Sequence, residues 1–445
     1  MKLKWKTQTW LCVLLPAVAA LTGCGGGNGA PKETTPSADM AETPKEDTTP
    51  VTLKLYAGQN LTDENWNKLL LEPLKQKYPY ITVEIIKPTA QMRIEQLVSA
   101  GDVPDLYTTF QGDIGNYIQL DLAEDMTPLV NLRKYDLSRF DRIYLDAIRA
   151  VSGNGGLYGI PYSVQFNALF YNKDIFDKFG AGYPQDGMTW EDTIELSRKV
   201  ARTDGTDRYY GLDLESPTRL SFPLSIVPVD AASNRANVLT DGWRTVFDTA
   251  KRMYEIAGNI PAKPAELTSG APLRFPNNKN VAMLATINIF ELMKKPTEAG
   301  MNWDVAQYPS YKGSPNTYGM VDLHMIGITK TSKHKEAALK VIEVFASDEV
   351  QLLGAKTRPS LSPLVNPAMK EQFGAGLDYM KGKRLQSIFK SKPVPAPLFS
   401  AYDGKARAIL NAQYTDFIVN NKDMNTALRT AQEEIDKMLQ AEAQK

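Results

Sequence analysis

The hydrophobic and polar positions that follow residue 50 predict alternating strands and helices. Val51, Leu53 and Leu55 alternate with more polar neighbours and Gly58 ends this run, which indicates a half-buried strand. The alternation of element types continues in four further segments: a helix over 64–78, a strand over 81–86, a helix over 90–100 and a strand over 104–110. Because parallel strands need a crossover helix, this order predicts a parallel sheet flanked by helices.

Later segments of the chain show the patterns of further helices and of a strand. Thr189 is followed three residues later by Asp192, which resembles a capping box and predicts a helix start. Hydrophobic residues recur at helical spacing in 334–346 and in 423–441, and we interpret these stripes as core positions. The segment YYGLDL at 209–214 is typical of a strand with a buried tyrosine.

The ends of the first and third predicted strands are the first candidates for a binding site. In open α/β sheets, ligands bind beyond the carboxyl ends of the strands. Here those ends are the tripeptides 58–60 and 109–111, which carry amide, hydroxyl and aromatic side chains. Such groups are suited to hydrogen bonding and stacking with a solute.

The first 23 residues have the features of a secretory signal. A basic start precedes an apolar run over 10–21, which is shorter than the about 20 residues that a membrane-spanning helix needs. The segment Leu21-Thr22-Gly23-Cys24 resembles the lipobox of bacterial lipoproteins, which implies cleavage before Cys24 and acylation of its thiol. The other cysteine, Cys12, lies inside the signal, so we expect no disulfide in the mature protein.

Composition and charge narrow the function further. Residues 25–50 contain no aromatic residue and no Val, Ile or Leu, so we expect a disordered tether there. The chain has 51 basic and 51 acidic residues. Loss of the three lysines in the signal leaves the mature protein with a formal net charge near −3. This balance argues against nucleic acid, which needs a basic surface. The length beyond the tether predicts two domains, since single cores stop growing near about 250–300 residues.

Signatures of catalysis and of cofactor binding are absent from the sequence. It has two histidines, His324 and His334, and no HExxH, P-loop or GxSxG motif; with one acylated cysteine, a Cys/His metal cluster is excluded. The glycine-rich segment 152–159 lacks dinucleotide-loop spacing and is interpreted as a turn. Adjacent Tyr209 and Tyr210 raise the alternative of a ferric site, but no partner ligand can be placed beside them. We expect neither an enzyme nor a bound cofactor or metal.

Seven segments in a fixed order resemble one known family. The two most specific are GDVPDLYTTFQGDIGNYIQLDLAEDMTPLV at 101–130 and GGLYGIPYSVQFNALFYNKDIFDKFG at 155–180. The others are MTWEDTIELSRKV, FPNNKNVAML, WDVAQYP, GITKTSKHKEAALKVIEVFASDEVQ and NKDMNTALRTAQEEIDKML. Together they resemble the family 1 extracellular solute-binding proteins of ABC importers, in the superfamily of maltose-binding protein. The similarity covers residues 51–445.

This resemblance implies an α/β fold of the two-lobed periplasmic-binding-protein type II, with hinge crossovers and a ligand cleft between the lobes. The implied division is a lipoprotein signal peptide at 1–23, a tether at 24–50, an N-lobe of 51–163 plus 322–360 and a C-lobe of 164–321 plus 361–445. The implied crossovers lie near Ser163–Gln165, Tyr318–Asp322 and Arg358–Pro363. Closure about such a hinge buries the ligand.

The resemblance also implies which residues contact the ligand. A site that binds without catalysis needs a few well-placed polar groups and apolar walls. The implied ligand-binding residues are Gln59, Asn60, Thr109, Phe110, Gln111, Asp113, Tyr162, Gln165, Trp243, Asn288, Phe290, Asp322 and His324. The family often carries a stacking tryptophan where this sequence has Asn288 and Phe290. Asn167 and Trp190 are assigned to structure instead.

The implied function is that of a lipid-anchored extracellular receptor that hands its solute to the permease subunits of an ABC importer. Because the implied contacts are mostly amides, hydroxyls and aromatic rings, we expect a neutral oligosaccharide. A polyamine, a peptide, glycerol phosphate or a ferric ion is an alternative solute. A carbohydrate-active enzyme and a surface adhesion lipoprotein are alternative functions. We expect a monomer at a Gram-positive type of cell membrane, held there by the lipid on Cys24.

Overall fold

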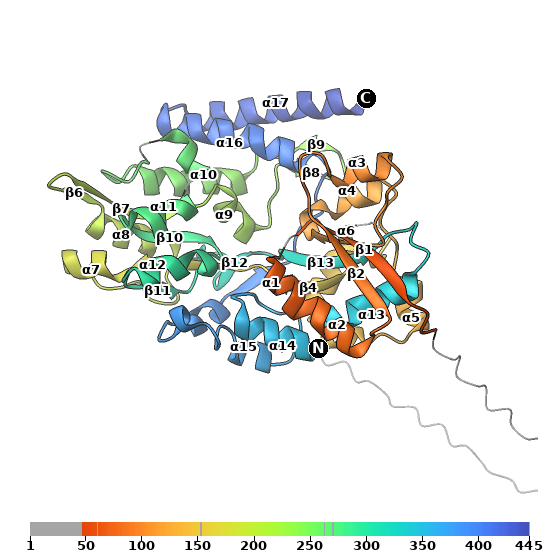
Figure 1. The fold of residues 1–445 in the computed structure, drawn as a ribbon. Coiled ribbons are helices and arrows are strands. Elements are labelled where there is room, and N and C mark those ends of the chain that lie inside the picture. The colour runs from red at the N-terminus through yellow and green to blue at the C-terminus, as the bar shows by residue number, and fades with distance from the viewer. Residues whose placement is uncertain (1–46, 60, 152–153, 262, 269–270, 445) are drawn as a thin grey trace, which may run out of the picture. The chain divides into compact units, whose positions relative to one another are not determined.

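The computed structural model describes residues 47–59, 61–151, 154–261, 263–268 and 271–444 (Figure 1). The predicted signal peptide, the predicted lipidation site Cys24 and most of the predicted tether lie outside the described residues. Within the described part of the chain, no helix combines the length and the apolar content that a membrane crossing requires. All elements described below belong to the unit that begins at Thr49.

A first sheet is built mainly from the amino-terminal third of the chain. Its five strands, in spatial order, are β2 (Ile81–Ile86), β1 (Val51–Ala57), β3 (Leu106–Phe110), β13 (Leu323–Ile328) and β4 (Ile160–Val164). Strand β1 pairs in parallel with both β2 and β3, which confirms the predicted parallel arrangement. Strand β13 returns from far along the chain and pairs antiparallel with β3 and β4. Leu53 and Leu55 are fully buried, as their alternation predicts.

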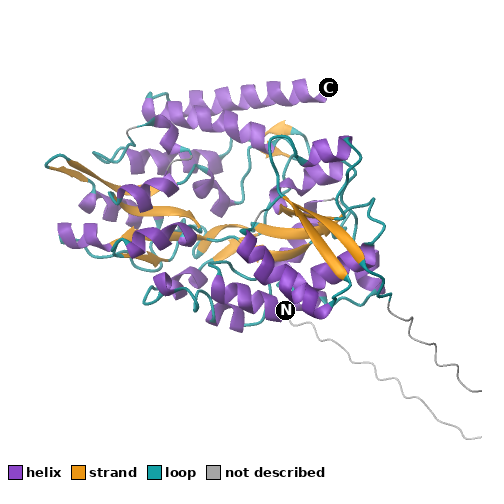
Figure 2. Ribbon diagram, in the orientation of Figure 1, coloured by secondary structure: helices purple, strands orange, loops and turns teal. Residues whose placement is uncertain are grey.

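Helices pack on this first sheet from both faces (Figure 2), as expected for strands whose two faces are both buried. These helices are α1 (Asp63–Trp66), η1 (Asn67–Leu71), α2 (Glu72–Lys77), α3 (Ile94–Ser99), η2 (Gln111–Asp113), α4 (Ile114–Gln119), α5 (Thr127–Leu132), η3 (Leu137–Arg139), α6 (Arg142–Val151), α13 (Lys335–Phe345), α14 (Asp348–Thr357) and α15 (Ala368–Glu371). The predicted helix over 64–78 is present, with one π-helical turn at η1. The helix predicted from residue 90 begins only at Ile94, because Arg93 is extended and acts as its N-cap.

A second sheet is built from the middle of the chain. Its strands, in spatial order, are β11 (Trp303–Ala306), β5 (Asn167–Asn172), β10 (Val281–Ile287), β7 (Asp207–Leu214) and β6 (Arg202–Asp204). Two short pairs complete the strands: β12 (Thr317–Met320) with β14 (Lys392–Val394), and β8 (Val229–Asp230) with β9 (Arg235–Ala236). The predicted strand over 209–214 lies within β7, and Tyr210 is buried as predicted.

Helices from the middle and the end of the chain surround the second sheet. They are α7 (Lys173–Phe179), α8 (Trp190–Val200), α9 (Thr218–Ser221), η4 (Phe222–Leu224), α10 (Asp241–Tyr254), η5 (Pro264–Leu267), α11 (Ala271–Asn278), η6 (Phe290–Met293), α12 (Lys294–Glu298), η7 (Asp378–Met380), η8 (Leu385–Lys390), α16 (Asp403–Val419) and α17 (Met424–Ala443). The predicted capping box at the start of α8 is confirmed, with Thr189 and Asp192 bonded to each other's backbone amides. The predicted last helix is α17.

Each sheet has its own hydrophobic cluster, and the chain passes between the two clusters several times. Cluster membership changes between Tyr162 and Phe166, between Tyr318 and Val321, and again beyond Met369. The connecting segments are bonded to each other: the Val164 amide donates to the Leu361 carbonyl at 2.8 Å, and the Gln165 amide donates to the Asp322 carbonyl at 2.9 Å. These segments therefore run side by side between the sheets.

Candidate functional site

The strand register of the first sheet brings most of the predicted site residues to one edge. His324, near the start of β13, lies opposite Phe110 at the end of β3 and opposite Ser163 near the end of β4. Strand β1 ends at the same edge, because it runs parallel to β3. Residues that are far apart in sequence, such as Gln59 and His324, are therefore gathered where an open α/β sheet binds its ligands.

The ends of β1 and β3 are tied together at this edge by Gln59 and Thr108. The Gln59 amide lies 3.2 Å from the Thr108 carbonyl oxygen and 3.1 Å from its Oγ1, and that hydroxyl donates to the Gln59 carbonyl at 3.0 Å. Gly58 permits this approach, since a Cβ at that position would lie 2.3 Å from the Thr108 carbonyl oxygen. The neighbouring Asn60, another predicted site residue, lies outside the described residues.

Phe110 and Gln111 present a ring and an amide directly after β3. The Phe110 side chain is 39% exposed and lies over Gly112, where an added Cβ would meet the ring at 2.6 Å. An exposed ring at a strand end can stack on the C–H face of a sugar. Gln111 is buried, and its Oε1 has no hydrogen-bond partner among the residues that the structure describes. A bound solute that donates a hydrogen bond would satisfy that oxygen.

Thr109 and Asp113 form a small polar group behind this edge. Thr109 is buried, and its hydroxyl donates to the Asp113 carboxylate at 3.3 Å. Burial raises the pKa of Asp113 to about 6, and the negative charge of Glu95 acts in the same direction. The Asp113 carboxyl group is therefore able to donate as well as accept a hydrogen bond at mildly acidic pH.

Tyr162, Gln165 and His324 meet where β4 and β13 pair. The Tyr162 ring packs on Phe345 with centroids 4.7 Å apart, and its centroid lies 6.1 Å from that of His324. Gln165 Nε2 lies 3.1 Å from His324 Nε2. Burial lowers the pKa of His324 to about 4, with a smaller contribution from the cation of Arg358. The imidazole is thus neutral near pH 7, and its Nε2 accepts from the Gln165 amide.

Asp322 lies on the segment that returns from the second sheet to the first. Burial raises the pKa of its carboxyl group, against the opposing influence of Arg219 and Arg407. Its backbone carbonyl holds Gln165, as described above, so the predicted residues of two connecting segments are in direct contact. This pairing fixes the backbone of Asp322 beside Gln165 on the connecting segments.

Two predicted site residues, Asn288 and Phe290, follow a strand of the second sheet and lie apart from the group at the first sheet. Asn288 follows β10, and its side-chain amide donates to the Pro359 carbonyl while its Oδ1 accepts from the Phe290 amide at 3.1 Å. Phe290 is fully buried, with centroids 5.1 Å from Phe170 and 5.8 Å from Trp303.

Trp243 is also a core residue, contrary to the expectation that it lines the binding site. Its side chain is 2% exposed on the inward face of α10. A ring that is covered by its own core has no face to offer to a solute, and the same holds for Phe290. We therefore retain neither ring in the candidate site.

Sequence reasoning missed a charged pair at the end of β7. Arg219 Nε lies 2.8 Å from Glu215 Oε2, and Arg219 Nη1 donates to Asn167 Oδ1 at 3.0 Å. Glu215 also accepts from the Thr286 hydroxyl at 3.2 Å. The signal was available, because Glu215 directly follows a strand that was predicted at 209–214.

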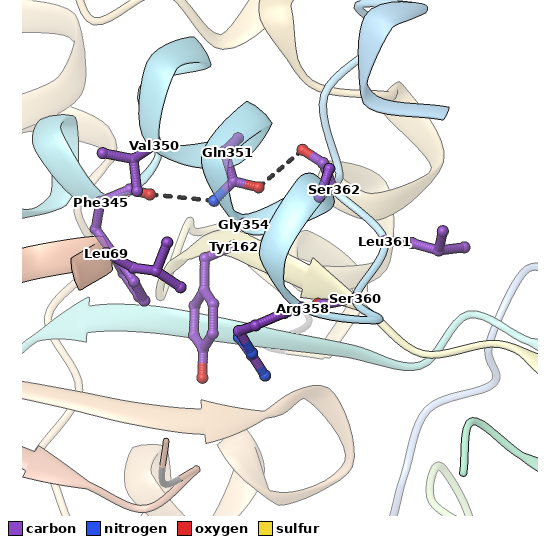
Figure 3. A pocket seen from close by; sticks show the side chains of 11 residues that line it. Leu69, Tyr162, Phe345, Val350, Gln351, Gly354, Arg358, Ser360, Leu361 and Ser362 are labelled. Atoms are coloured by element: carbon purple, nitrogen blue, oxygen red, sulfur yellow. Dashed lines mark hydrogen bonds between the residues drawn. The ribbon is translucent and has the colours of Figure 1, made fainter. Parts of the chain in front are cut away.

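Sequence reasoning also missed Arg358, which lies among the predicted residues. It follows α14 and lines a small pocket with Tyr162 and Ser360 (Figure 3). Ser360 Oγ is 2.7 Å from Ser163 Oγ, which fixes this segment to β4. In Figure 3 the Arg358 guanidinium and the Tyr162 hydroxyl lie beside each other and point the same way. The only sequence signal for Arg358 was its place in a predicted crossover.

The chemistry of this edge is hydrogen bonding, stacking and charge pairing. Across the residues that the structure describes, no group of three or more His, Cys, Asp and Glu side chains is arranged to hold a metal ion. The edge offers amide, hydroxyl, imidazole and guanidinium groups together with one exposed ring. Such a set recognises a polar solute with apolar faces.

Comparison with known proteins identifies sequence relatives of this chain. The profile of the family described as bacterial extracellular solute-binding protein matches residues 58–352. A Brucella abortus protein that carries the name of a binding protein is 23% identical over 347 residues, which cover 70% of this chain and 81% of that protein. The arabinooligosaccharide-binding protein of Bacillus subtilis is 28% identical over 151 residues, or 32% of this chain and 31% of that protein.

Solved structures share the fold over most of the chain. The sugar-binding protein MalE of Xanthomonas citri superposes with a TM-score of 0.70 at 22% identity, covering 88% of this chain and 98% of that one. An ABC substrate-binding protein of Listeria monocytogenes in complex with cycloalternan also gives a TM-score of 0.70, at 20% identity over 88% and 99% of the two chains. The fold is therefore the two-lobed type II periplasmic-binding-protein fold, as the sequence resemblance implied.

Proposed function

The chain belongs to the bacterial extracellular solute-binding protein family, and we propose that it binds an oligosaccharide between its two lobes and delivers it to an ABC permease. The observation that carries this proposal is the single edge at which Gln59, Phe110, Gln111, Gln165 and His324 meet. Amides and an imidazole there suit the hydroxyls of a sugar, and the exposed ring suits its C–H face. The solute leaves unaltered in this proposal.

The relatives support a carbohydrate as the solute class. One is named for binding arabinooligosaccharides, and two of the similar structures contain or are named for sugars. The exposed ring of Phe110 takes the role of aromatic platform in our proposal, since Phe290 and Trp243 lie in the core. In our proposal Asp113, Thr109, Tyr162 and Asp322 border this edge, while Asn288 follows β10 of the second sheet and donates to the Pro359 carbonyl.

We propose that the lobes are those implied by the resemblance and move about the bonded connecting segments. The N-lobe would then comprise 51–163 plus 322–360, and the C-lobe 164–321 plus 361–445. The changes of hydrophobic cluster near residues 164 and 320 support the first two boundaries, whereas Leu364 and Met369 still belong to the cluster of the first sheet, beyond the third boundary at 360. Hydrogen bonds between the segments, such as that from Gln165 to Asp322, would let the lobes rotate while the hinge stays intact.

Binding is tested by the thermal stability of the purified chain in a panel of monosaccharides and oligosaccharides. A ligand at about one hundred times its dissociation constant stabilises a protein by about 2.7 kcal/mol. We expect a rise in melting temperature with one group of oligosaccharides, which chromatography then recovers unchanged. No stabilisation by any sugar, or a shortened product, would contradict the proposal.

We also propose that a lipid on Cys24 holds the protein at the outer face of the cell membrane as a monomer. The lipobox segment and the tether composition support this anchoring. Cells that express Cys24→Ser should incorporate no labelled palmitate into the protein and should release it into the medium. A Cys12→Ser variant is the matched control and should remain labelled and cell-bound. Equal labelling of both variants would refute the anchor.

A further inference from the structure

Arg358 has an unusual setting for an arginine. It stands at the carboxyl end of α14, where its backbone amide caps the helix by donating to the Gly354 carbonyl at 2.8 Å. Its side chain is only 18% exposed, and within the described part of the chain its buried Nε has no hydrogen-bond partner. A buried guanidinium costs desolvation energy unless acceptors surround it, because it carries five N–H donors.

The groups around Arg358 do not satisfy all N–H donors of its guanidinium. Tyr162 and the neutral His324 face it from β4 and β13, and neither carries a charge near pH 7. The nearest carboxylate is Glu291 on η6, whose Oε1 lies 3.9 Å from Arg358 Nε. This distance is too long for a hydrogen bond, and the Glu291 side chain is 60% exposed. Glu291 therefore compensates the charge of Arg358 from a distance, without a hydrogen bond to its Nε.

Arg358 also joins the two halves of the candidate site. Its neighbour Pro359 accepts from Asn288, beyond the end of β10, while Ser360 is bonded to Ser163 on β4. The segment that carries Arg358 is thus bonded to the strand ends of both sheets. Its guanidinium lines the pocket of Figure 3. We interpret this fixed guanidinium, whose N–H groups can still donate, as an element that recognises the solute.

The fork of a guanidinium matches a carboxylate, which accepts two parallel N–H hydrogen bonds. We propose that the bound oligosaccharide carries a carboxylate on one sugar unit, that Arg358 binds this carboxylate, and that Glu291 partly compensates the guanidinium until the solute arrives. This inference rests on the proposed function and replaces the expectation of a neutral solute. That expectation was based on a set of residues that did not include Arg358. The amides and the Phe110 ring still recognise the hydroxyls and C–H faces of the sugar units.

The experiment measures the affinity of the mature chain for short oligomers of galacturonate, glucuronate and mannuronate, each beside its methyl ester. Esterification removes the negative charge and keeps the sugar skeleton. We expect one acid series to bind and its ester to bind at least about 10-fold more weakly, the loss expected when one charge-assisted pair is removed. Arg358→Gln should reduce acid binding to about the level of the ester, so that the ratio of acid to ester affinity falls to about 1.

Glu291→Gln provides a second variant that does not depend on a buried position. Removing the competing carboxylate should strengthen acid binding several-fold and leave ester binding unaltered. Glu298→Gln is the matched control, because it removes the same charge from an exposed position on α12, and it should change neither affinity. If Arg358→Gln fails to fold, the comparison of Glu291→Gln with Glu298→Gln still decides the proposal.

The outcomes separate this inference from the proposed function. Equal binding of acid and ester, or binding of neutral oligosaccharides only, overturns the carboxylate contact and leaves the proposed function standing. Stabilisation by sugar phosphates alone overturns it as well. Absence of binding to every saccharide overturns both proposals.

Discussion

The strand ends of the two sheets differ in how their polar groups are satisfied. At the second sheet, Arg219 is held by Glu215 and Asn167 within the protein. At the first sheet, Gln111 Oε1 has no hydrogen-bond partner among the described residues, and Arg358 Nε, which lines the pocket beside Tyr162, has a carboxylate only at 3.9 Å. A buried polar group without a partner costs about 1–3 kcal/mol.

This difference assigns different roles to the two edges. At the second edge the guanidinium lies against a carboxylate of the chain at 2.8 Å, so this ion pair contributes to folding whether or not a solute is present. At the first edge, Gln111 Oε1 has no hydrogen-bond partner among the residues that the structure describes, and a bound solute could supply one. A solute that pairs this oxygen gains energy that the empty protein lacks, which is the physical basis of tight and selective binding.

The largest expected effect is the loss of the charged pair at the second edge. Arg219→Ala leaves Glu215 partly buried without its cation, and we expect the free energy of unfolding to fall by about 3–5 kcal/mol. Denaturant unfolding measures this change. Arg198→Ala, which breaks an exposed pair with Glu195, is the control and should cost less than about 0.5 kcal/mol. If Arg219→Ala has normal stability but binds no solute, Arg219 contacts the ligand and the pair is not mainly structural.

The next effect is the pH dependence that His324 imposes on the first edge. Its folded pKa of about 4 is below the ordinary 6.5, so the unfolded chain binds more protons between these values. Its contribution to the free energy of unfolding is therefore present above about pH 6.5 and is lost as the pH falls toward 4. The contribution to the free energy of unfolding is about 3 kcal/mol.

The test of this pH dependence compares wild type with His324→Gln in denaturant unfolding at several pH values. The difference between their unfolding free energies should shrink as the pH falls toward 4. Both proteins contain Asp113, so its contribution to the pH dependence cancels in this difference. Nuclear magnetic resonance adds a direct check, since the chain has two histidines and the variant identifies the signal of His324. A His324 signal that titrates near its ordinary value would show that the ring is not buried in solution.

A smaller effect is expected from the exposed ring at the first edge. Phe110→Ala should weaken binding of the solute by about 10-fold through lost stacking, and change the free energy of unfolding by less than about 0.5 kcal/mol. Isothermal calorimetry and denaturant unfolding measure the two quantities. Leu132→Ala truncates another exposed apolar residue and should leave binding unaltered. A large loss of stability in Phe110→Ala would mean that this ring serves packing, as Phe290 does.

The smallest expected change in stability is that of Gln111→Met. The two side chains have similar volume, and the substitution removes an acceptor that has no partner. We expect the free energy of unfolding to stay constant or to rise by up to about 1 kcal/mol, while solute binding weakens. Thermal unfolding with and without solute shows both effects. A clear destabilisation would mean that the chain already satisfies this amide.

Local patterns were sufficient for most elements of the fold. The alternation at 51–55, the capping box at Thr189 and the helical stripe at 423–441 depend on residues a few positions apart, and all three agree with the structure. The same logic located the strand ends, because the end of a strand is a local property. The start of α3 was misplaced because the extended backbone at Arg93 leaves no periodic signal.

The sequence by itself therefore determined the order of elements, the parallel start of the first sheet and the family. Only the tertiary structure decided that Trp243 and Phe290 face a core and that Arg358 stands open beside Tyr162. The reason is that such facts depend on which way a helix faces and on the register of strands more than 150 residues apart, as for Ser163 and His324. Local hydrophobic patterns carry no information about that register.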